Sequence, residues 1–237
     1  MRNTLAIATK EVRTYFASPI AYIIMAAFLF ATGFFFVSSL SGAFREASVR
    51  GFLSAGAFVL LILGPVLTMR LIAEETKIGT IELLLTAPVR DYEVIVGKYL
   101  AALAILIAML ALTLYYPLML FVFASPDPGP IFTGYIGILL VGSAFLSVGL
   151  FASTLSANQI VSAVTGLIVL LIFWFLANAA EFLGGVSATL LNYLSPQSHL
   201  NDFNRGVIDT GSIIYYVTVI AVFLFLAIRS LETRRWR

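Results

Sequence analysis

Eight of the chain's 26 charged side chains lie in one stretch of 25 residues, which runs from Glu74 to Lys98. The stretch reads EETKIGTIELLLTAPVRDYEVIVGK and holds five acidic and three basic side chains. The chain as a whole is 61% hydrophobic and has a mean hydropathy of +1.03. The chemistry that these residues offer is ion pairing and helix capping. The stretch is therefore expected to make a contact.

Residues that could carry out a reaction are scarce. The chain has no cysteine, which excludes disulfides and thiolate metal sites, and its one histidine, His199, cannot form a histidine cluster. The pair Gly97-Lys98 lacks the upstream glycine and the hydroxyl residue of a phosphate-binding loop. Neither a nucleophile elbow nor an HExxH sequence is present. We therefore expect no catalytic, cofactor-binding or metal-binding residue and no ATP hydrolysis by the chain itself.

The uncharged segments that surround this stretch predict membrane-spanning helices. A helix needs about 20 apolar residues to cross a bilayer. Uncharged runs occupy 14–44, 51–69, 99–126, 128–180 and 210–228, and the fourth run is long enough for two crossings. We expect one all-α polytopic membrane domain over 1–237, with six spans at about 19–42, 51–70, 99–124, 131–155, 158–180 and 211–230.

Basic residues set the expected orientation of these spans. With the N-terminus inside, eleven of the fourteen lysines and arginines fall on the cytoplasmic side and three fall outside. The three outer residues are Arg45, Arg50 and Arg205. Both termini and the loop 71–98 are then cytoplasmic, and the chain is placed in the inner membrane of a prokaryote. A net charge of +2 gives no sign of nucleic-acid binding.

Two further segments have their own patterns. In 1–17, Leu5, Ala8, Val12, Tyr15 and Phe16 share one face of a helix, and Arg2, Lys10, Glu11 and Arg13 share the other. This pattern is typical of a helix in the membrane interface, and a solvated tail is the alternative. The segment 181–210 is interrupted by Gly184-Gly185 and Pro196, which predicts re-entrant helices on the outer side or a surface loop with one short helix.

Glu181 and the small residues of the fourth span allow two further interpretations. Glu181 lies near the outer end of span 5, where it would line an exit path or rest in water at the interface. Gly149, Ser153 and Ala157 recur every four residues and permit close helix approach.

The charged stretch itself divides at Pro88. A helix over 74–86 places Ile78, Ile81, Leu84 and Leu85 on one face. Pro88 ends that helix, and Asp91 is the expected N-cap of the next one, with Glu93 in its first turn. The excess of acid makes the inner leaflet a poor partner, since lipid docking recruits lysine and arginine. Docking in a protein partner and packing within the chain are the two remaining alternatives, and we favour the partner.

The sequence RLIAEETKIGTIELLLTAPV, followed by Gly97-Lys98, resembles the membrane subunits of type-2 ABC exporters, the ABC-2 permeases. These carry a stretch of the form AEExxxGTxExLLxxP after their second span. The resemblance extends to the opening KEVRTYFASP and the tail LSPxxHLxDFxRGVID. The tail is similar to permeases of the gliding-motility group and the related nitrous-oxide-reductase maturation permease. The matching positions of the loop are Ala73, Glu74, Glu75, Gly79, Thr80, Glu82, Leu84, Leu85, Pro88, Gly97 and Lys98.

The resemblance implies that this loop holds a coupling helix that docks on a cytoplasmic ATPase. The implied coupling residues are Glu74, Glu75, Gly79, Thr80, Ile81, Glu82, Leu84, Leu85 and Pro88. ATP and magnesium would bind the ATPase, of which the complex would hold two copies. A second permease, either identical or paralogous, would complete an export pathway along spans 1, 2 and 5. Membrane lipid and an auxiliary membrane or outer protein complete the implied partners.

Two rival functions follow from the same residues. One is a mechanotransmission subunit that relays ATPase motion to an outer partner without transport, which the short outer loops disfavour. The other is an intramembrane enzyme, which would need paired carboxylates, a histidine pair or a serine–base dyad within the spans, and the sequence offers none.

Overall fold

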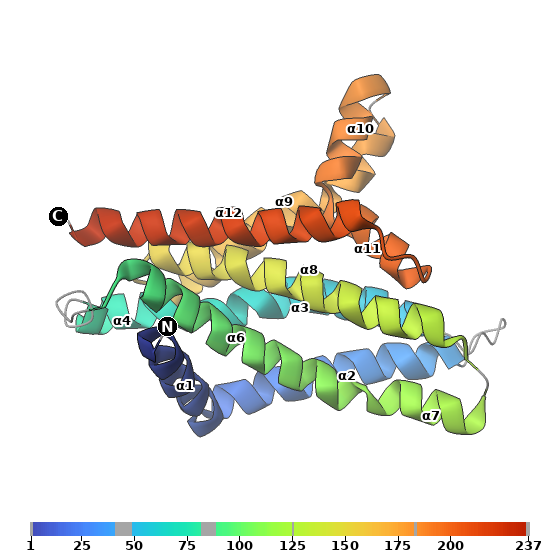
Figure 1. Cartoon of the computed structure of the whole chain (residues 1–237), viewed down its shortest axis with the longest axis horizontal. Coiled ribbons are helices and arrows are strands. Elements are labelled where there is room, and N and C mark those ends of the chain that lie inside the picture. The colour runs from blue at the N-terminus through green and yellow to red at the C-terminus, as the bar shows by residue number, and fades with distance from the viewer. Residues whose placement is uncertain (1, 41–48, 82–88, 125, 183, 236–237) are drawn as a thin grey trace.

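The computed structural model describes residues 2–40, 49–81, 89–124, 126–182 and 184–235. Within these residues the regular elements are helices (Figure 1). They are α1 (Arg2–Ala17), α2 (Pro19–Leu40), α3 (Arg50–Thr68), α4 (Arg70–Ile78), α6 (Asp91–Thr113), α7 (Tyr115–Phe123), α8 (Pro128–Leu155), α9 (Gln159–Phe182), α10 (Gly185–Leu194), α11 (Pro196–Asn204) and α12 (Thr210–Arg235).

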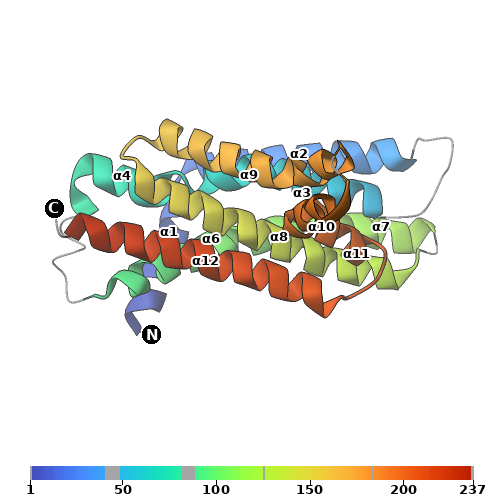
Figure 2. The ribbon, with the colours of Figure 1, turned by 90° about the horizontal axis from the view of Figure 1, so that it is seen from above.

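Six apolar stretches in the described residues are long enough to cross a membrane, and each overlaps one expected span. They are Pro19–Leu40, Arg50–Ile78, Asp91–Phe123, Pro128–Leu155, Gln159–Phe182 and Thr210–Thr233. The long helices run side by side, and both termini lie toward the same end of the bundle (Figures 1 and 2). We call this the charged end, because α1, α4 and the start of α6 bring Lys10, Glu11, Glu75 and Lys98 there.

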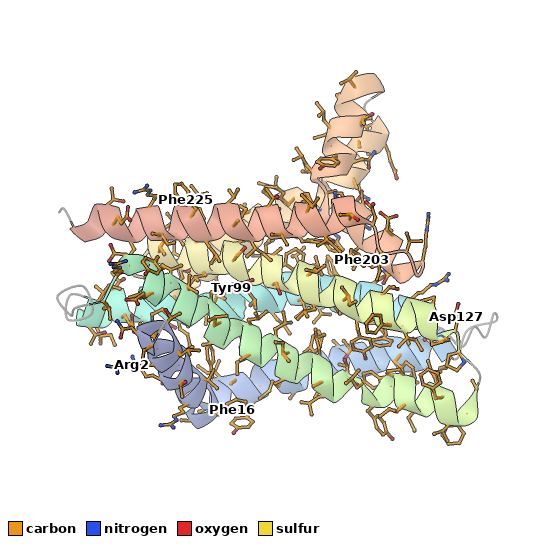
Figure 3. All side chains as sticks on the ribbon, viewed as in Figure 1. Arg2, Phe16, Tyr99, Asp127, Phe203 and Phe225 are labelled. Atoms are coloured by element: carbon orange, nitrogen blue, oxygen red, sulfur yellow. The ribbon has the colours of Figure 1, made fainter. Side chains whose placement is uncertain are left out.

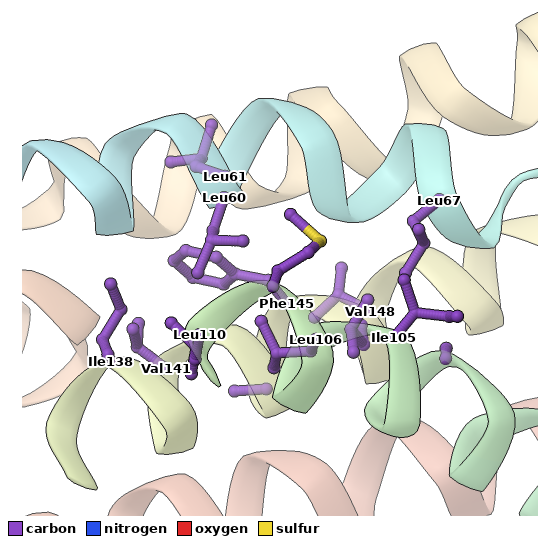
Figure 4. Packing of buried hydrophobic residues seen from close by; sticks show 14 of the residues in the cluster. Leu60, Leu61, Leu67, Ile105, Leu106, Leu110, Ile138, Val141, Phe145 and Val148 are labelled. Atoms are coloured by element: carbon purple, nitrogen blue, oxygen red, sulfur yellow. The ribbon is translucent and has the colours of Figure 1, made fainter. Parts of the chain in front are cut away.

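The core lies between α3, α6 and α8, where apolar side chains of the three helices interlock (Figure 4). α8 is the most enclosed candidate span, with 78% of its most apolar window buried, against 22% for α9 and for α12. The outward faces of α2, α9 and α12 carry exposed apolar side chains, such as Phe30, Ile172 and Phe225. A soluble protein could not carry so many, so these faces indicate a lipid or protein environment.

Small residues let α8 approach its neighbours closely, as their spacing predicts. A Cβ atom built on Gly149 would clash with the Thr68 hydroxyl of α3 and would lie 3.1 Å from the Cα atom of Pro65. Ser153 is fully buried beside α4. Ala157 is exposed, because α8 ends at Leu155.

α1 differs from its expected form in which face it buries. The helix crosses the ends of the long helices at an angle (Figure 1). It buries Ala8, Glu11 and Tyr15, whereas Leu5 and Phe16 are exposed. Figure 3 shows Arg2 and Phe16 at the outer side of this helix. The placement of Glu11 on a solvated face was wrong, because its carboxylate meets a buried lysine of α6.

Two short helices, α10 and α11, occupy most of the segment 181–210 at the opposite end of the bundle from the termini. α10 projects away from the long helices and buries no residue, whereas α11 packs against α8 (Figure 1). The Thr133 hydroxyl of α8 donates to the Phe203 carbonyl at 2.7 Å, and Phe203 is buried between the two helices (Figure 3). The depth of these helices in a bilayer stays a prediction.

His199, on α11, connects α10 to α12 through hydrogen bonds. Its Nε2 atom is 2.9 Å from the Tyr193 carbonyl, and its Nδ1 atom is 2.9 Å from the Ser212 hydroxyl. A carbonyl can only accept, so in the neutral ring Nε2 carries the proton and Nδ1 accepts from Ser212. The imidazole also stacks on the Tyr215 ring, with centroids 4.2 Å apart. One side chain therefore ties three helices together.

Replacing His199 with alanine is expected to free α10 from the bundle. The Tyr193 carbonyl loses its donor and the aromatic stack disappears, so amides of α10 should exchange with solvent about tenfold faster, the equivalent of one lost hydrogen bond. Hydrogen exchange of the purified chain measures this, with Asn201→Ala on the exposed side of the same helix as control. Equal exchange in the two variants would show that His199 does not hold α10.

Candidate functional site

The second span continues beyond its apolar part as α4, and this extension begins the candidate site. α3 ends at Thr68, and α4 carries the charged sequence Arg70–Ile78. Gly79 ends the helix in a left-handed conformation, with φ of 76°, and its amide donates to the Thr76 carbonyl. A new helical turn begins at Thr80 and Ile81. The expectation of one helix over 74–86 was wrong, because the left-handed residue interrupts it.

Gly79 has a conformational role in the structure, whereas close approach of an ATPase backbone at this position stays a prediction. Among the residues that the structure describes, nothing lies within 4 Å of a Cβ atom built there, so within the described chain the need for glycine comes from the backbone conformation. Left-handed conformation costs a residue with a Cβ roughly 1–2 kcal/mol, and asparagine adopts it more readily than others.

We expect Gly79→Asn to assemble with the ATPase almost as well as the wild type does. Gly79→Ala and Gly79→Leu should both lose assembly, to a similar extent. The measurement is recovery of the assembled complex with its ATPase, defined below, at matched membrane levels. A graded loss that follows side-chain size, with alanine tolerated and leucine not, would instead favour close approach of another backbone.

A buried ion-pair cluster joins α1, α4 and α6. Lys98 is 1% exposed, and its Nζ atom lies 2.9 Å from Glu11 Oε1 and 2.8 Å from Glu75 Oε1. Lys10, on the surface, lies 3.6 Å from the first carboxylate and 3.7 Å from the second. A charge removed from water must be paired, so the lysine requires both helices to stay in place. We call Lys98, Glu11, Glu75 and Lys10 the charged joint.

Gly97 permits the close crossing of α1 and α6 beside this joint. A Cβ atom there would lie 2.9 Å from the Thr4 carbonyl oxygen and 3.0 Å from Ile7, so only glycine fits without a shift. One turn earlier, Glu93 accepts from the Asn3 side chain of α1 and from the Arg90 amide. The N-cap of α6 is Arg90, and Asp91 is the first helical residue, one position from the expected cap. The Gly97-Lys98 pair thus serves packing and ion pairing within the chain.

Tyr15 and Arg70 fix the other end of α1 to the junction of α3 and α4. The Tyr15 hydroxyl donates to the Leu67 carbonyl at 2.7 Å, and burial raises the pKa of this hydroxyl above its usual range. The guanidinium of Arg70 lies over the Tyr15 ring, 4.8 Å from its centroid, and donates to the Ser18 hydroxyl. These contacts hold the first turn of α4 against the position where α1 ends and α2 begins.

The three elements border a hollow of about 710 Å³, whose lining includes all four residues of the charged joint together with Arg70 and Glu74. The Glu75 Oε2 atom is buried and has no hydrogen-bond partner within the described part of the chain. This arrangement pairs the lysines and carboxylates of the joint with one another. What it can do is pass a displacement of α4 to α1 and α6.

The structure places the expected coupling residues in three different settings. Glu74, Gly79 and Thr80 are exposed, as a docking surface requires. Glu75 pairs within the chain, and Ile81 is 7% exposed and joins the core. The prediction that Ile78 and Ile81 share one apolar face is also wrong, because Ile78 is 67% exposed whereas Ile81 is buried. Glu82, Leu84, Leu85 and Pro88 lie outside the described residues.

Sequence reasoning missed the joint itself. Glu11 and Lys98 are 87 residues apart, and no local pattern pairs them. A signal was nevertheless present: Lys98 lies only four residues from Val94 and Ala102, both buried, so the lysine falls on the buried face of its helix. A lysine on such a face predicts a carboxylate partner on a neighbouring helix.

This architecture, six apolar helices around one core with a charged joint at one end, defines a multi-pass membrane protein. The family model described as ABC-2 family transporter protein matches residues 5–236. The chain belongs to this family, which makes it a permease subunit of an ABC transporter. Members of the family normally work with a cytoplasmic ATPase subunit. No curated protein matches the chain.

Proposed function

We propose that this permease couples ATP hydrolysis by a separate ATPase to export of a substrate across the cytoplasmic membrane. The observation that carries the proposal is the charged joint. It binds α4, which leads directly into the segment that resembles the coupling helix, to α1 and α6. A push on that segment would therefore move three helices together.

The proposed ATPase contact comprises the exposed residues Glu74, Ile78, Gly79 and Thr80 together with Glu82, Leu84, Leu85 and Pro88. Glu74 is free to meet a basic group of the ATPase. Glu75 and Ile81 are assigned to contacts within the permease, since their side chains are already engaged. The tail motif supports the gliding-motility and nitrous-oxide-reductase maturation group as the subgroup.

The proposed complex contains two permeases and two ATPase subunits, with ATP and magnesium on the latter. α2 and α9 leave most of their apolar window uncovered, which supports spans 1 and 5 at a contact with a second permease. The family resemblance adds span 2 to the proposed pathway.

The proposed orientation has both termini in the cytoplasm. Lys77 and Asp127 are exposed at opposite ends of the bundle, so they are the better labelling positions, whereas Glu75 is engaged in the joint. The chain has no native cysteine. In intact cells an impermeant maleimide should label Asp127→Cys and leave Lys77→Cys unmodified. The reverse pattern would overturn the orientation.

Copurification with a cytoplasmic ABC ATPase that assembles with the wild-type permease tests the function. Truncating Leu84 and Leu85 to alanine should weaken assembly about tenfold or more, because burying each leucine stabilises a contact by roughly 1.5–3 kcal/mol. The matched control is Leu190→Ala/Leu194→Ala, two exposed leucines of α10 at the opposite end. The purified permease alone should hydrolyse no ATP. Full assembly of the Leu84 and Leu85 variant would remove this segment from the proposed contact.

A further inference from the structure

The junction between α3 and α4 contains a side chain from another helix. The Ser153 hydroxyl of α8 accepts from the backbone amides of Ile72 and Ala73, both at 3.1 Å, and donates to the Met69 carbonyl at 2.9 Å. In an uninterrupted helix those two amides would donate to the carbonyls of residues 68 and 69. A side chain inserted into this ladder is a recognised cause of a helix kink.

The surroundings hold this insertion in place. Ser153 and Thr68 are fully buried, and so are Ile72 and Ala73. Gly149 brings α8 against α3 one turn before Ser153, and the Thr68 hydroxyl donates to the Gly64 carbonyl of its own helix. The break between α3 and α4 is therefore bonded to α8 by three hydrogen bonds to backbone groups.

α8 carries the attachment to the other end of the molecule. It runs from Ser153 beside α4 to Thr133, which donates to the Phe203 carbonyl of α11. Gly137 packs against Phe203 and Leu200, where a Cβ atom would lie 2.7 Å from the Phe203 Cβ atom. α8 thus bonds to backbone groups at the junction of α3 and α4 with one end and to a backbone group of α11 with the other.

We propose that Ser153 is a positioning residue for coupling: its hydroxyl fixes the angle between α3 and α4 and passes displacement of α4 to α8, and through α8 to α11. The inference rests on the proposed function, in which α4 receives motion from the ATPase. The hydrogen bonds of the Ser153 hydroxyl go to Met69, Ile72 and Ala73, which are not residues of the charged joint.

Ser153→Ala and Ser147→Ala form a matched pair. Both serines are fully buried on α8, but the Ser147 hydroxyl donates only to the Ala144 carbonyl of its own helix. In the purified permease, hydrogen exchange follows the amides of Ile72 and Ala73, and spin labels at Lys77→Cys and Ala157→Cys report the distance between α4 and the end of α8. Both label positions are exposed and no other cysteine interferes.

Ser153→Ala should either speed exchange of those amides about 2- to 10-fold or shift the distance between the labels. The first result follows if the amides lose their partner, and the second if α4 closes its own helical hydrogen bonds. Ser147→Ala should change neither. If Ser153→Ala matches Ser147→Ala in both measurements, Ser153 does not set the angle.

The complex with the ATPase separates a positioning role from a merely structural one. Labels at Asp127 and Lys77 follow displacement across the molecule when ATP is added. Ser153→Ala should retain ATPase assembly and ATP hydrolysis, while the ratio of displaced to undisplaced populations in the ATP-bound distance distribution falls roughly 2- to 30-fold, the range seen for residues that carry coupling. An unchanged ratio would overturn the proposal. Failure of the wild-type permease to assemble with the ATPase would instead contradict the proposed function and leave the measurements on the permease alone to decide the role of Ser153.

Discussion

Lys98→Met is expected to destabilise the purified permease by about 3–5 kcal/mol, because it leaves the carboxylates of Glu11 and Glu75 without their buried counter-charge and with only the surface residue Lys10 nearby. The thermal unfolding midpoint should fall by roughly 10 °C, since 1 kcal/mol corresponds to a few degrees in a chain of this length. Circular dichroism in detergent measures the midpoint. Assembly with the ATPase should fall with it, because α4 is no longer held against α1 and α6.

Two controls make this result specific to the joint. Lys77→Met removes an exposed lysine of α4 and should change stability by about 0.5 kcal/mol or less. The triple variant Lys98→Met/Glu11→Gln/Glu75→Gln removes all three charges and should recover much of the loss, because a buried ion pair can be replaced by neutral groups at little cost. A Lys98→Met midpoint equal to that of Lys77→Met would show that the buried pairs do not stabilise the permease.

Gly149→Ala should separate α8 from α3 and destabilise the bundle by about 1–3 kcal/mol. The added methyl group would collide with the Thr68 hydroxyl and approach the Pro65 Cα atom to 3.1 Å, and the proline backbone cannot move aside as a flexible side chain could. Thermal unfolding measures the loss, and Thr68→Ala in the same chain should restore part of it.

Gly51→Ala is the control for this substitution. Gly51 also lies in a helix of this bundle, but a Cβ atom there would only touch the Ser39 side chain at an ordinary 3.6 Å. Alanine should be neutral or stabilising at that position, because glycine weakens helices. Equal effects at the two positions would mean that close approach of α3 and α8 does not limit stability.

The sequence allowed the spans to be predicted because long uncharged runs have few alternatives to a membrane helix. Pro19, Pro128 and Gln159 begin helices within three residues of the expected starts. The ends were harder where charge and apolar surface mix: α4 and the first residues of α6 extend beyond the apolar stretches and are held by contacts with α1. Hydropathy indicates whether a residue suits water or lipid. It does not indicate which residue of another helix that residue will contact.

The charged stretch shows why the candidate site could be located but not assigned. Its composition indicated a contact, and both docking and internal packing were open. Glu75 and Ile81 pack internally, so internal packing holds for part of the stretch, whereas Glu74 and Thr80 are exposed and their docking on a partner stays a prediction. Exposed and engaged residues occur on both sides of Gly79, so the division follows contacts with other helices, which a local sequence pattern does not show. The left-handed φ of Gly79, which ends α4, is likewise not predictable from a glycine in a helical pattern.

The central claim is that α1 and α4 move as one body when the ATPase binds ATP. Spin labels test it in the reconstituted complex, at Lys77 with Arg13 for the distance between α4 and α1, and at Lys77 with Asp127 for the distance across the bundle. All three positions are exposed. We predict that ATP shifts the second distance and leaves the first unchanged. A first distance that changes while the second stays fixed would show that α4 moves alone, and would contradict the role of the charged joint.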